Sequence, residues 1–149
     1  MLRLALPILK WASSWSTPIY VGGQEDPYMV RWFLIPRNRV VNAYLHQFLR
    51  SDDDRAMRDH PWYSLALLLD GRYIENDDRG SREYRAGNLR FRSATYRHQI
   101  ELIDGQHCWT LFLTGPRLRD WGFHCPWGWR HWREFTTGRD GERVGKGCD

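Results

Sequence analysis

The sequence predicts an all-β domain, built as an antiparallel barrel or a double-sheet jelly roll. Short apolar runs that alternate with a period of two recur between Tyr28 and Phe135, and such alternation is typical of half-buried strands. Gly, Pro and Asp-Gly turn signals separate these runs at short intervals. Seven or eight short strands with regular turns favour this fold class over a helical or mixed one.

The N-terminal segment, residues 1–15, is the only helix that the pattern supports. Its apolar residues recur at rough helical spacing, which predicts a short arm packed on the domain. The apolar run is too short to span a bilayer, and it lacks the small-residue cleavage pattern of a signal peptide. Residues 13–26 contain Pro and Gly breakers and are predicted as a loop.

Three strands are expected in the first half of the domain. Residues 28–35 alternate and end at Pro36, residues 40–50 form a second strand, and residues 60–69 form a third. The alternation groups side chains by face: Tyr44, His46 and Phe48 in the second strand, and Arg58, His60, Trp62, Ser64, Ala66 and Leu68 in and before the third.

The second half is predicted to continue in hairpins. Asp70-Gly71 and Asp104-Gly105 are hairpin-type turn signals, and residues 76–82 are predicted as a polar surface loop. The expected strands are 72–75, 89–92, 96–103 and 108–114. The aromatic stretch 121–135 is irregular, and the Gly-rich tail is expected to be flexible. The predicted organisation is therefore an arm (1–27), a barrel (28–135) and a tail (136–149).

Composition limits the function classes. A chain of 149 residues with 42% hydrophobic residues is one domain with a packed core. The net charge of +4 comes from Arg residues spread along the chain, with no nucleic-acid-binding signature, so nucleic acid is not an expected partner. Three Cys without CxxC spacing argue against a disulfide framework and for a reducing, cytoplasmic compartment.

The stretch Ser51–Gly71 carries the candidate chemistry. Polar residues Asp52 to His60 lead directly into the apolar strand that ends at Asp70-Gly71. This layout is typical of a small-molecule or metal pocket in the mouth of a barrel. Motifs of serine acyl transfer, nucleotide hydrolysis and zinc proteases are absent from the sequence.

Two sequence frames resemble the motifs of the cupin superfamily. The first cupin motif, G-x5-H-x-H-x3/4-E-x6-G, is similar in spacing to Asp52, Arg58, His60, Ser64 and Gly71, of which His60 and Gly71 match in type. The second motif, G-x5-P-x-G-x2-H-x3-N, is similar in spacing to Gly87, Ser93, Thr95, His98 and Leu102, of which Gly87 and His98 match. The HPW step, the DGRYIE turn and the WTLFLTGP strand also resemble small cupin-like proteins found with phages and prophages.

The resemblance implies a cupin-type double-stranded β-helix barrel with a short N-terminal arm. In cupins, the motif histidines and glutamate bind one divalent metal. Here His60 and His98 match ligand positions, whereas Arg58 and Ser64 replace the other two, and Arg offers no lone pair to a metal. His46 is the expected third ligand, ahead of Glu75, His107 or His124. The metal's identity (Fe, Mn, Ni or Zn) is not distinguished.

Two functions follow as hypotheses. The first is a divalent-metal-dependent oxygenase or isomerase acting on a small anionic molecule, with Arg58 orienting the anion and Tyr96 (or Tyr63) donating a proton. The alternative is a metal-free ligand-binding protein, or a phage/host interaction protein whose Trp-rich ending is the contact surface.

Each candidate residue also has a structural interpretation. His60 could cap its strand, His98 could be a satisfied core histidine, and His46 could be structural. The acids Asp52 to Asp54 could be a solvated loop, and the Trp cluster could seal a sheet edge. The apolar arm, residues 1–15, suits a homodimer contact, so a homodimer is predicted.

Overall fold

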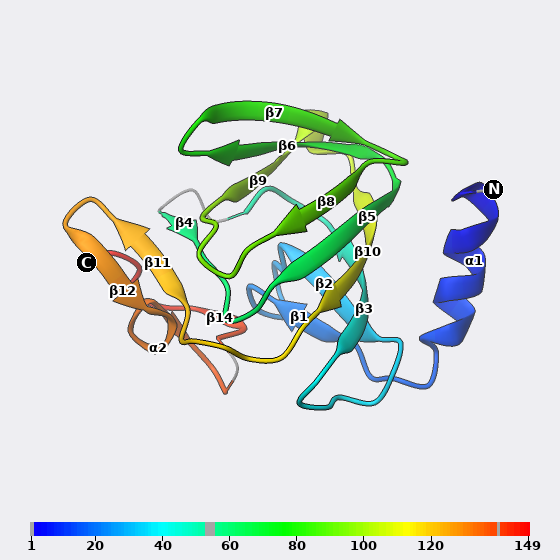
Figure 1. Ribbon diagram of the computed structural model, residues 1–149, viewed down its shortest axis with the longest axis horizontal. Helices are drawn as coiled ribbons and strands as arrows, with labels where there is room; N and C mark the ends of the chain where they lie inside the picture. The colour runs from blue at the N-terminus through cyan, green and yellow to red at the C-terminus, as the bar shows by residue number, and fades with distance from the viewer. Residues whose placement is uncertain (1, 53–55, 140) are drawn as a thin grey trace.

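One large and two smaller β-sheets enclose a common interior in the computed structural model of this chain (Figure 1). The structure describes residues 2–52, 56–139 and 141–149. The larger sheet has six antiparallel strands in the order β1-β2-β3-β10-β5-β8. They are β1 (Ile19–Val21), β2 (Met29–Phe33), β3 (Asn42–Phe48), β10 (Cys108–Thr114), β5 (Ser64–Asp70) and β8 (Leu89–Arg92).

The opposite side of the barrel is made of two smaller sheets. One has the order β7-β6-β9 and the other β12-β11-β4. An antiparallel bridge between Arg58 and His98 joins them. The strands are β6 (Arg72–Asp77), β7 (Gly80–Arg85), β9 (Gln99–Leu102), β4 (Met57–Arg58), β11 (Gly122–Cys125) and β12 (Gly128–His131). The predicted all-β antiparallel barrel is confirmed.

The two predicted hairpins are wrong in connectivity. Asp70-Gly71 joins β5 in the large sheet to β6 in the opposite one, and β9 and β10 are likewise in different sheets across Asp104-Gly105. The tight turn at Gly71 has φ +83°, and a Cβ there would lie 2.7 Å from the carbonyl oxygen of His107. The chain does turn at both Asp-Gly pairs, as predicted, but each turn connects two different sheets instead of two strands of one hairpin.

Several elements differ from the sequence prediction. Residues 76–82 are not a surface loop, because the β6–β7 hairpin includes them. The short strand β1 lies in a segment predicted as loop, and β4 precedes the strand predicted at residues 60–69. That strand, β5, begins at Ser64 instead of residue 60. Strands of two or three residues are too short to show a period of two, so only their partners reveal them.

The register of the large sheet stacks its inward-facing side chains in layers. Met29, Phe48 and Cys108 lie opposite one another and belong to a buried core cluster with Tyr73 and Leu102. This cluster forms an apolar layer of the barrel interior. The two layers above it consist of Arg31, His46 and Thr110, and then of Phe33, Tyr44 and Phe112.

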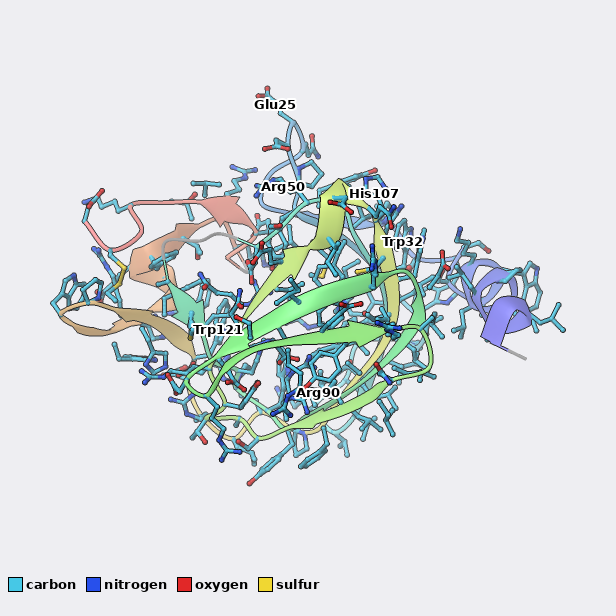
Figure 2. The ribbon with its side chains drawn as sticks, turned by 90° about the horizontal axis from the view of Figure 1, so that it is seen from above. Glu25, Trp32, Arg50, Arg90, His107 and Trp121 are labelled. Carbon is cyan, nitrogen blue, oxygen red and sulfur yellow. A yellow bond between two sulfur atoms is a disulfide. The ribbon has the colours of Figure 1, made fainter. Side chains whose placement is uncertain are left out.

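Helix α1 (Leu2–Ala12) lies outside the barrel, on the side of β5 and β10 (Figure 1). Lys10 Nζ lies 4.1 Å from the ring centroid of Trp109, which stacks on Trp32; Figure 2 shows Trp32 on the barrel side that faces the helix. The described helices include none that is both long and apolar enough to cross a bilayer. The predicted homodimer contact through this arm stays a prediction.

A disulfide corrects the expectation drawn from the cysteine count. Cys125 on β11 and Cys148 are bonded across 23 positions of sequence, whereas Cys108 is free and fully buried. The bond ties the tail, which forms β13 (Thr136–Thr137) and β14 (Arg143–Val144), to the β11–β12 hairpin. The tail is thus attached to the barrel through this bond. The predicted flexibility of the tail and the predicted cytoplasmic location stay predictions. The pairing depends on the fold of the hairpin, so the Cys spacing gave no sign of it.

Reduction of this disulfide is expected to lower the free energy of unfolding by about 2–4 kcal/mol, because the cross-link restricts the unfolded chain. Urea denaturation with and without a dithiol reductant measures the difference. A Cys125→Ser/Cys148→Ser double variant should show no response to reductant. Titration of three thiols in urea without reductant would contradict the pairing, since one is expected.

Candidate ligand pocket inside the barrel

A cavity of about 210 Å³ occupies the barrel interior and reaches the C-terminal tail. Of the predicted site residues, His46, Arg58, His60 and His98 all line it. They come from β3, from β4 and the segment after it, and from the segment before β9. The structure therefore brings together residues up to 52 positions apart, and the two cupin-like frames meet in one cavity.

His60 and His98 contact each other through their ring nitrogens. The two Nε2 atoms are 2.9 Å apart. His98 Nδ1 lies 3.0 Å from Glu75 Oε1, although the angle departs from that of a regular hydrogen bond. A proton on His98 Nδ1 suits the carboxylate, which leaves His98 Nε2 as acceptor and His60 Nε2–H as donor.

Glu75 is held by a buried two-point ion pair. Arg92 Nε lies 2.8 Å from Glu75 Oε1, and the Arg92 terminal nitrogen lies 2.9 Å from Oε2. Both side chains are almost fully buried, and Arg90 Nε adds a contact at 3.3 Å. Burial raises the pKa of Glu75, but the contacts with His98 and Arg92 outweigh it and hold the pKa well below its usual range.

His46 and Arg31 form the second polar pair in the cavity. Arg31 Nε donates to His46 Nε2 at 2.9 Å, so the lone pair of that nitrogen is already used. The Arg31 guanidinium also lies over the Tyr44 ring, 4.9 Å from its centroid. Within the described part of the chain, no carboxylate lies within ion-pair distance of Arg31, and its two terminal nitrogens have no hydrogen-bond partner.

Arg58, in contrast, has partners for its terminal nitrogens. One lies 3.0 Å from Asp52 Oδ2, and the other donates to the hydroxyl of Tyr28. Asp52 is thus a buried ion-pair partner and not a solvated loop residue, whereas Asp53 and Asp54 lie outside the described residues. Arg31 is therefore better placed than Arg58 to pair with an incoming anion.

The three cavity histidines are neutral at pH 7. Burial lowers the pKa of His98 to about 4. Burial also lowers the pKa of His46 and His60 well below the usual value, and the nearby guanidinium groups lower both further. The pocket thus combines neutral imidazoles with cationic guanidinium groups, of which Arg31 lacks a balancing carboxylate among the described residues.

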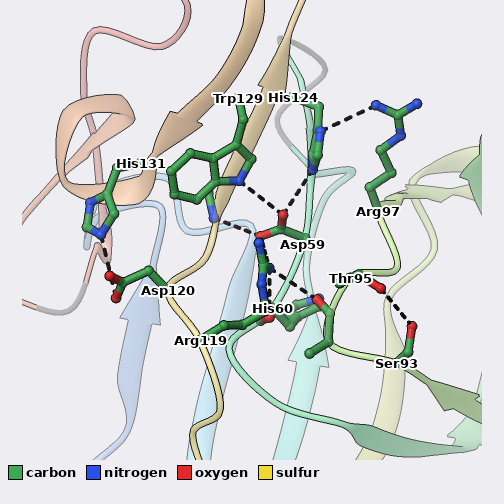
Figure 3. A network of polar contacts seen from close by, with 12 residues as sticks. Asp59, His60, Ser93, Thr95, Arg97, Arg119, Asp120, His124, Trp129 and His131 are labelled. Atoms are coloured by element: carbon green, nitrogen blue, oxygen red, sulfur yellow. Dashed lines mark hydrogen bonds and ion pairs between the residues drawn. The ribbon is translucent and has the colours of Figure 1, made fainter.

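Asp59 fixes the C-terminal hairpin beside His60 (Figure 3). Its buried carboxylate accepts from Gly122 N at 2.8 Å and from Trp129 Nε1 at 3.0 Å. It also contacts His124 Nε2 at 3.0 Å and Arg119 at 3.1 Å. Trp129 and His124 are thereby held as parts of a structural clamp, which agrees with the sealing role considered for the Trp-rich ending.

Tyr96 and Ser64, two other residues singled out in the sequence, have different surroundings. Neither is among the described residues that line the cavity. The Tyr96 hydroxyl donates to Asp77 Oδ2 at 2.6 Å, outside the lining. The predicted catalytic role of Tyr96 stays a prediction, and this placement does not support it.

Sequence reasoning missed Arg31, and it ranked Glu75 only as a distant third ligand. Arg31 occupies an inward position of a predicted strand, between apolar residues at 29 and 33. A charged residue on the inward face of a strand was a usable signal, because such a position is normally apolar. Glu75 is likewise a charged residue in a predicted strand, residues 72–75.

The donor set does not fit a divalent metal well. His60 and His98 supply two nitrogens, His46 Nε2 is bonded to Arg31, and Glu75 is paired with Arg92. Among the described residues, no cluster of three His, Cys, Asp or Glu is arranged to hold a metal ion. Metal sites usually need three or four protein ligands, and cationic guanidinium groups nearby repel a cation.

Comparisons with known proteins identify the fold. No protein-family model matches the sequence, and no curated protein is similar enough to match. Among solved structures, the chain is similar to FeII HppE (13% identity, TM-score 0.56, covering 66% of this chain and 56% of HppE). It is also similar to the DMSP lyase DddQ from Ruegeria pomeroyi DSS-3 (14%, TM-score 0.57, 71% and 59%) and to an RmlC-like cupin from Shewanella frigidimarina NCIMB 400 (15%, TM-score 0.52, 68% and 84%).

These likenesses show the fold. The chain has the cupin-type double-stranded β-helix barrel, as predicted from the sequence frames. Its match spans less than two thirds of the length of HppE and of DddQ. An association with phages stays a prediction.

Proposed function

We propose that this protein binds a small organic anion inside the barrel and does so without a metal. One observation carries the proposal: the two terminal nitrogens of Arg31 have no hydrogen-bond or ion-pair partner among the described residues, although Arg31 lines the cavity beside neutral histidines. Of the carboxylates that line the same cavity, Asp52 pairs with Arg58, and Glu142 forms no ion pair with Arg31. Arg31 is half-buried, and a cation partly withdrawn from water is stabilised by a counter-ion, which a carboxylate or phosphate would supply.

The His60–His98 pair adds a hydrogen-bonding wall to the same cavity. A neutral imidazole can donate through one nitrogen and accept through the other, so the pair can bind either a carbonyl or a hydroxyl group of the ligand. Glu75 orients His98 from outside the cavity lining, and Arg92 fixes Glu75. This arrangement supports a binding pocket, or an enzyme that moves a proton at a bound anion.

The proposal is tested with the Arg31→Gln variant. Its affinity for acetate and inorganic phosphate, measured by calorimetry on chelator-treated protein, is expected to fall roughly 10- to 150-fold, as for the loss of a charged hydrogen bond of 1.5–3 kcal/mol. Arg82→Gln is the matched control, because Arg82 is exposed on β7 outside the cavity lining.

Three outcomes of this experiment are informative. Equal affinities in the wild type and Arg31→Gln, or no anion binding in the wild type, would refute the proposal. Binding that appears only after addition of Zn²⁺, Mn²⁺ or Fe²⁺ would favour the metal-dependent oxygenase or isomerase predicted from the sequence. Binding that does not change with metal would support the metal-free pocket.

A further inference from the structure

The cavity contains an uncovered layer of aromatic rings directly above the Arg31 and His46 layer. Phe33, Tyr44 and Phe112 lie opposite one another in the β2-β3-β10 register. The Phe33 and Tyr44 centroids are 5.2 Å apart, and the Tyr44 and Phe112 centroids are 6.3 Å apart. All three rings line the cavity, and Phe33 and Phe112 are only half-buried.

Half-buried rings that face an internal cavity leave apolar surface in contact with water. Covering such surface stabilises a complex by roughly 25 cal/mol per Å². A ligand with a flat ring would cover this surface well, because aromatic pairs pack with their ring centroids about 4.5–7 Å apart. An inorganic ion would leave these rings uncovered.

The layers also determine how such a ligand would be oriented. The layer of Met29, Phe48 and Cys108 is apolar, so an anionic group has its partners one layer higher, at Arg31. The next layer is aromatic, so an apolar body attached to the anion would lie against Phe33 and Phe112. His46, which stacks on Phe112 at 4.9 Å, connects the two layers.

We propose that the pocket selects a small flat carboxylate, of the size of one aromatic ring with its acid group. The inference rests on the proposed anion-binding function and adds the chemistry of the ligand's body. The cavity of about 210 Å³ is smaller than the roughly 300–1,000 Å³ of pockets for drug-sized ligands, which limits the ligand to about one ring. Arg31 pairs with the carboxylate, and Phe33 and Phe112 pack on the ring.

Calorimetry with three probes tests the selection. Benzoate carries both features, acetate only the charge, and benzyl alcohol only the ring. Benzoate is expected to bind at least about tenfold more tightly than either of the others, which corresponds to 1.4 kcal/mol. The Phe112→Leu variant is expected to lose about tenfold more affinity for benzoate than for acetate. Phe33→Leu provides a second variant if Phe112→Leu folds poorly.

A matched control is Phe91→Leu, because Phe91 is exposed on β8, stacks on Tyr63 and does not line the cavity. This variant should keep the wild-type preference for benzoate. Equal affinities for benzoate and acetate, both lowered by Arg31→Gln, would overturn the ring selection while leaving the anion-binding proposal standing. Benzyl alcohol binding as tightly as benzoate, or no binding of benzoate and acetate, would instead overturn the anion-binding proposal.

Discussion

The Glu75→Gln variant is expected to lower the free energy of unfolding by about 3–5 kcal/mol, the usual cost of breaking a buried ion pair. Glu75 is the shared counter-ion of Arg92 and Arg90, and it also faces His98. Without its charge, Arg92 would remain buried with the Tyr73 hydroxyl as its other hydrogen-bond partner among the described residues. The neutral amide cannot replace the lost attraction, and it brings a donor group toward the guanidinium.

Thermal denaturation measures this effect as a fall of about 6–20 °C in Tm, using 2–4 °C per kcal/mol for a chain of this size. Glu101→Gln is the control, because Glu101 is exposed on the neighbouring strand β9 and should change the stability by less than about 0.5 kcal/mol. A loss below about 1 kcal/mol in Glu75→Gln would contradict the ion-pair interpretation.

A double variant separates the lost pair from a packing defect. Glu75→Leu combined with Arg92→Met removes both fully buried charges, and Arg90, which also loses its partner, is more exposed to water. Replacement of buried ion pairs by apolar residues is often neutral or stabilising. We therefore expect the double variant to recover most of the stability that Glu75→Gln loses. A double variant as unstable as the single one would show that packing, not charge, is the cause.

Lowering the pH from 7 toward 4 is expected to destabilise the protein strongly. Burial holds the pKa of His98 at about 4 in the folded state, whereas the unfolded value is about 6.5. Between these values the unfolded chain binds more protons than the folded one, so stability falls as the pH falls through this window. His98 alone accounts for about 3 kcal/mol, at 1.36 kcal/mol for each unit of pKa.

Other buried groups in and beside the cavity act in the same direction. The pKa values of His46 and His60 are also lowered by burial, so each adds to the loss of stability below about pH 6.5. The pKa of Glu75 is held below its usual range by His98 and Arg92 despite burial. Its contribution is therefore present above its unfolded pKa of about 4.3 and is lost at lower pH.

Urea denaturation at pH 7, 6, 5 and 4 tests this dependence. His98→Gln is expected to flatten the slope between pH 6.5 and 4, because it removes one of the protons taken up on unfolding. His107→Gln, at an exposed position, should keep the wild-type slope. Constant stability from pH 7 to pH 5 would contradict the buried neutral state of these histidines.

Part of the site was predictable from the sequence because strand alternation is a local property. The period of two placed Tyr44, His46 and Phe48 on one face, and the structure confirms that they point into the barrel. The resemblance of the two sequence frames to the cupin motifs predicted the fold. It also predicted that His60 and His98 share one cavity, and both line it in the structure. Their predicted roles as metal ligands stay predictions.

Other features depended on which strands pair. The Asp-Gly turns are local signals, but whether the chain returns in the same sheet or crosses to the opposite one is decided by packing of the whole barrel. The disulfide between Cys125 and Cys148 likewise required the hairpin and the tail to meet. These contacts are distant in sequence, so neither spacing nor composition encodes them.

The sequence by itself determined an all-β barrel, its inward faces and the three histidines of its pocket, because each follows from short-range periodicity and motif spacing. Only the tertiary structure decided the electrostatics of that pocket. It paired Arg58 with Asp52 and Arg92 with Glu75, while Arg31 was left with an imidazole as its hydrogen-bond partner. Ion pairing depends on distances of a few ångströms between residues far apart in the chain, and these distances exist only in the folded barrel.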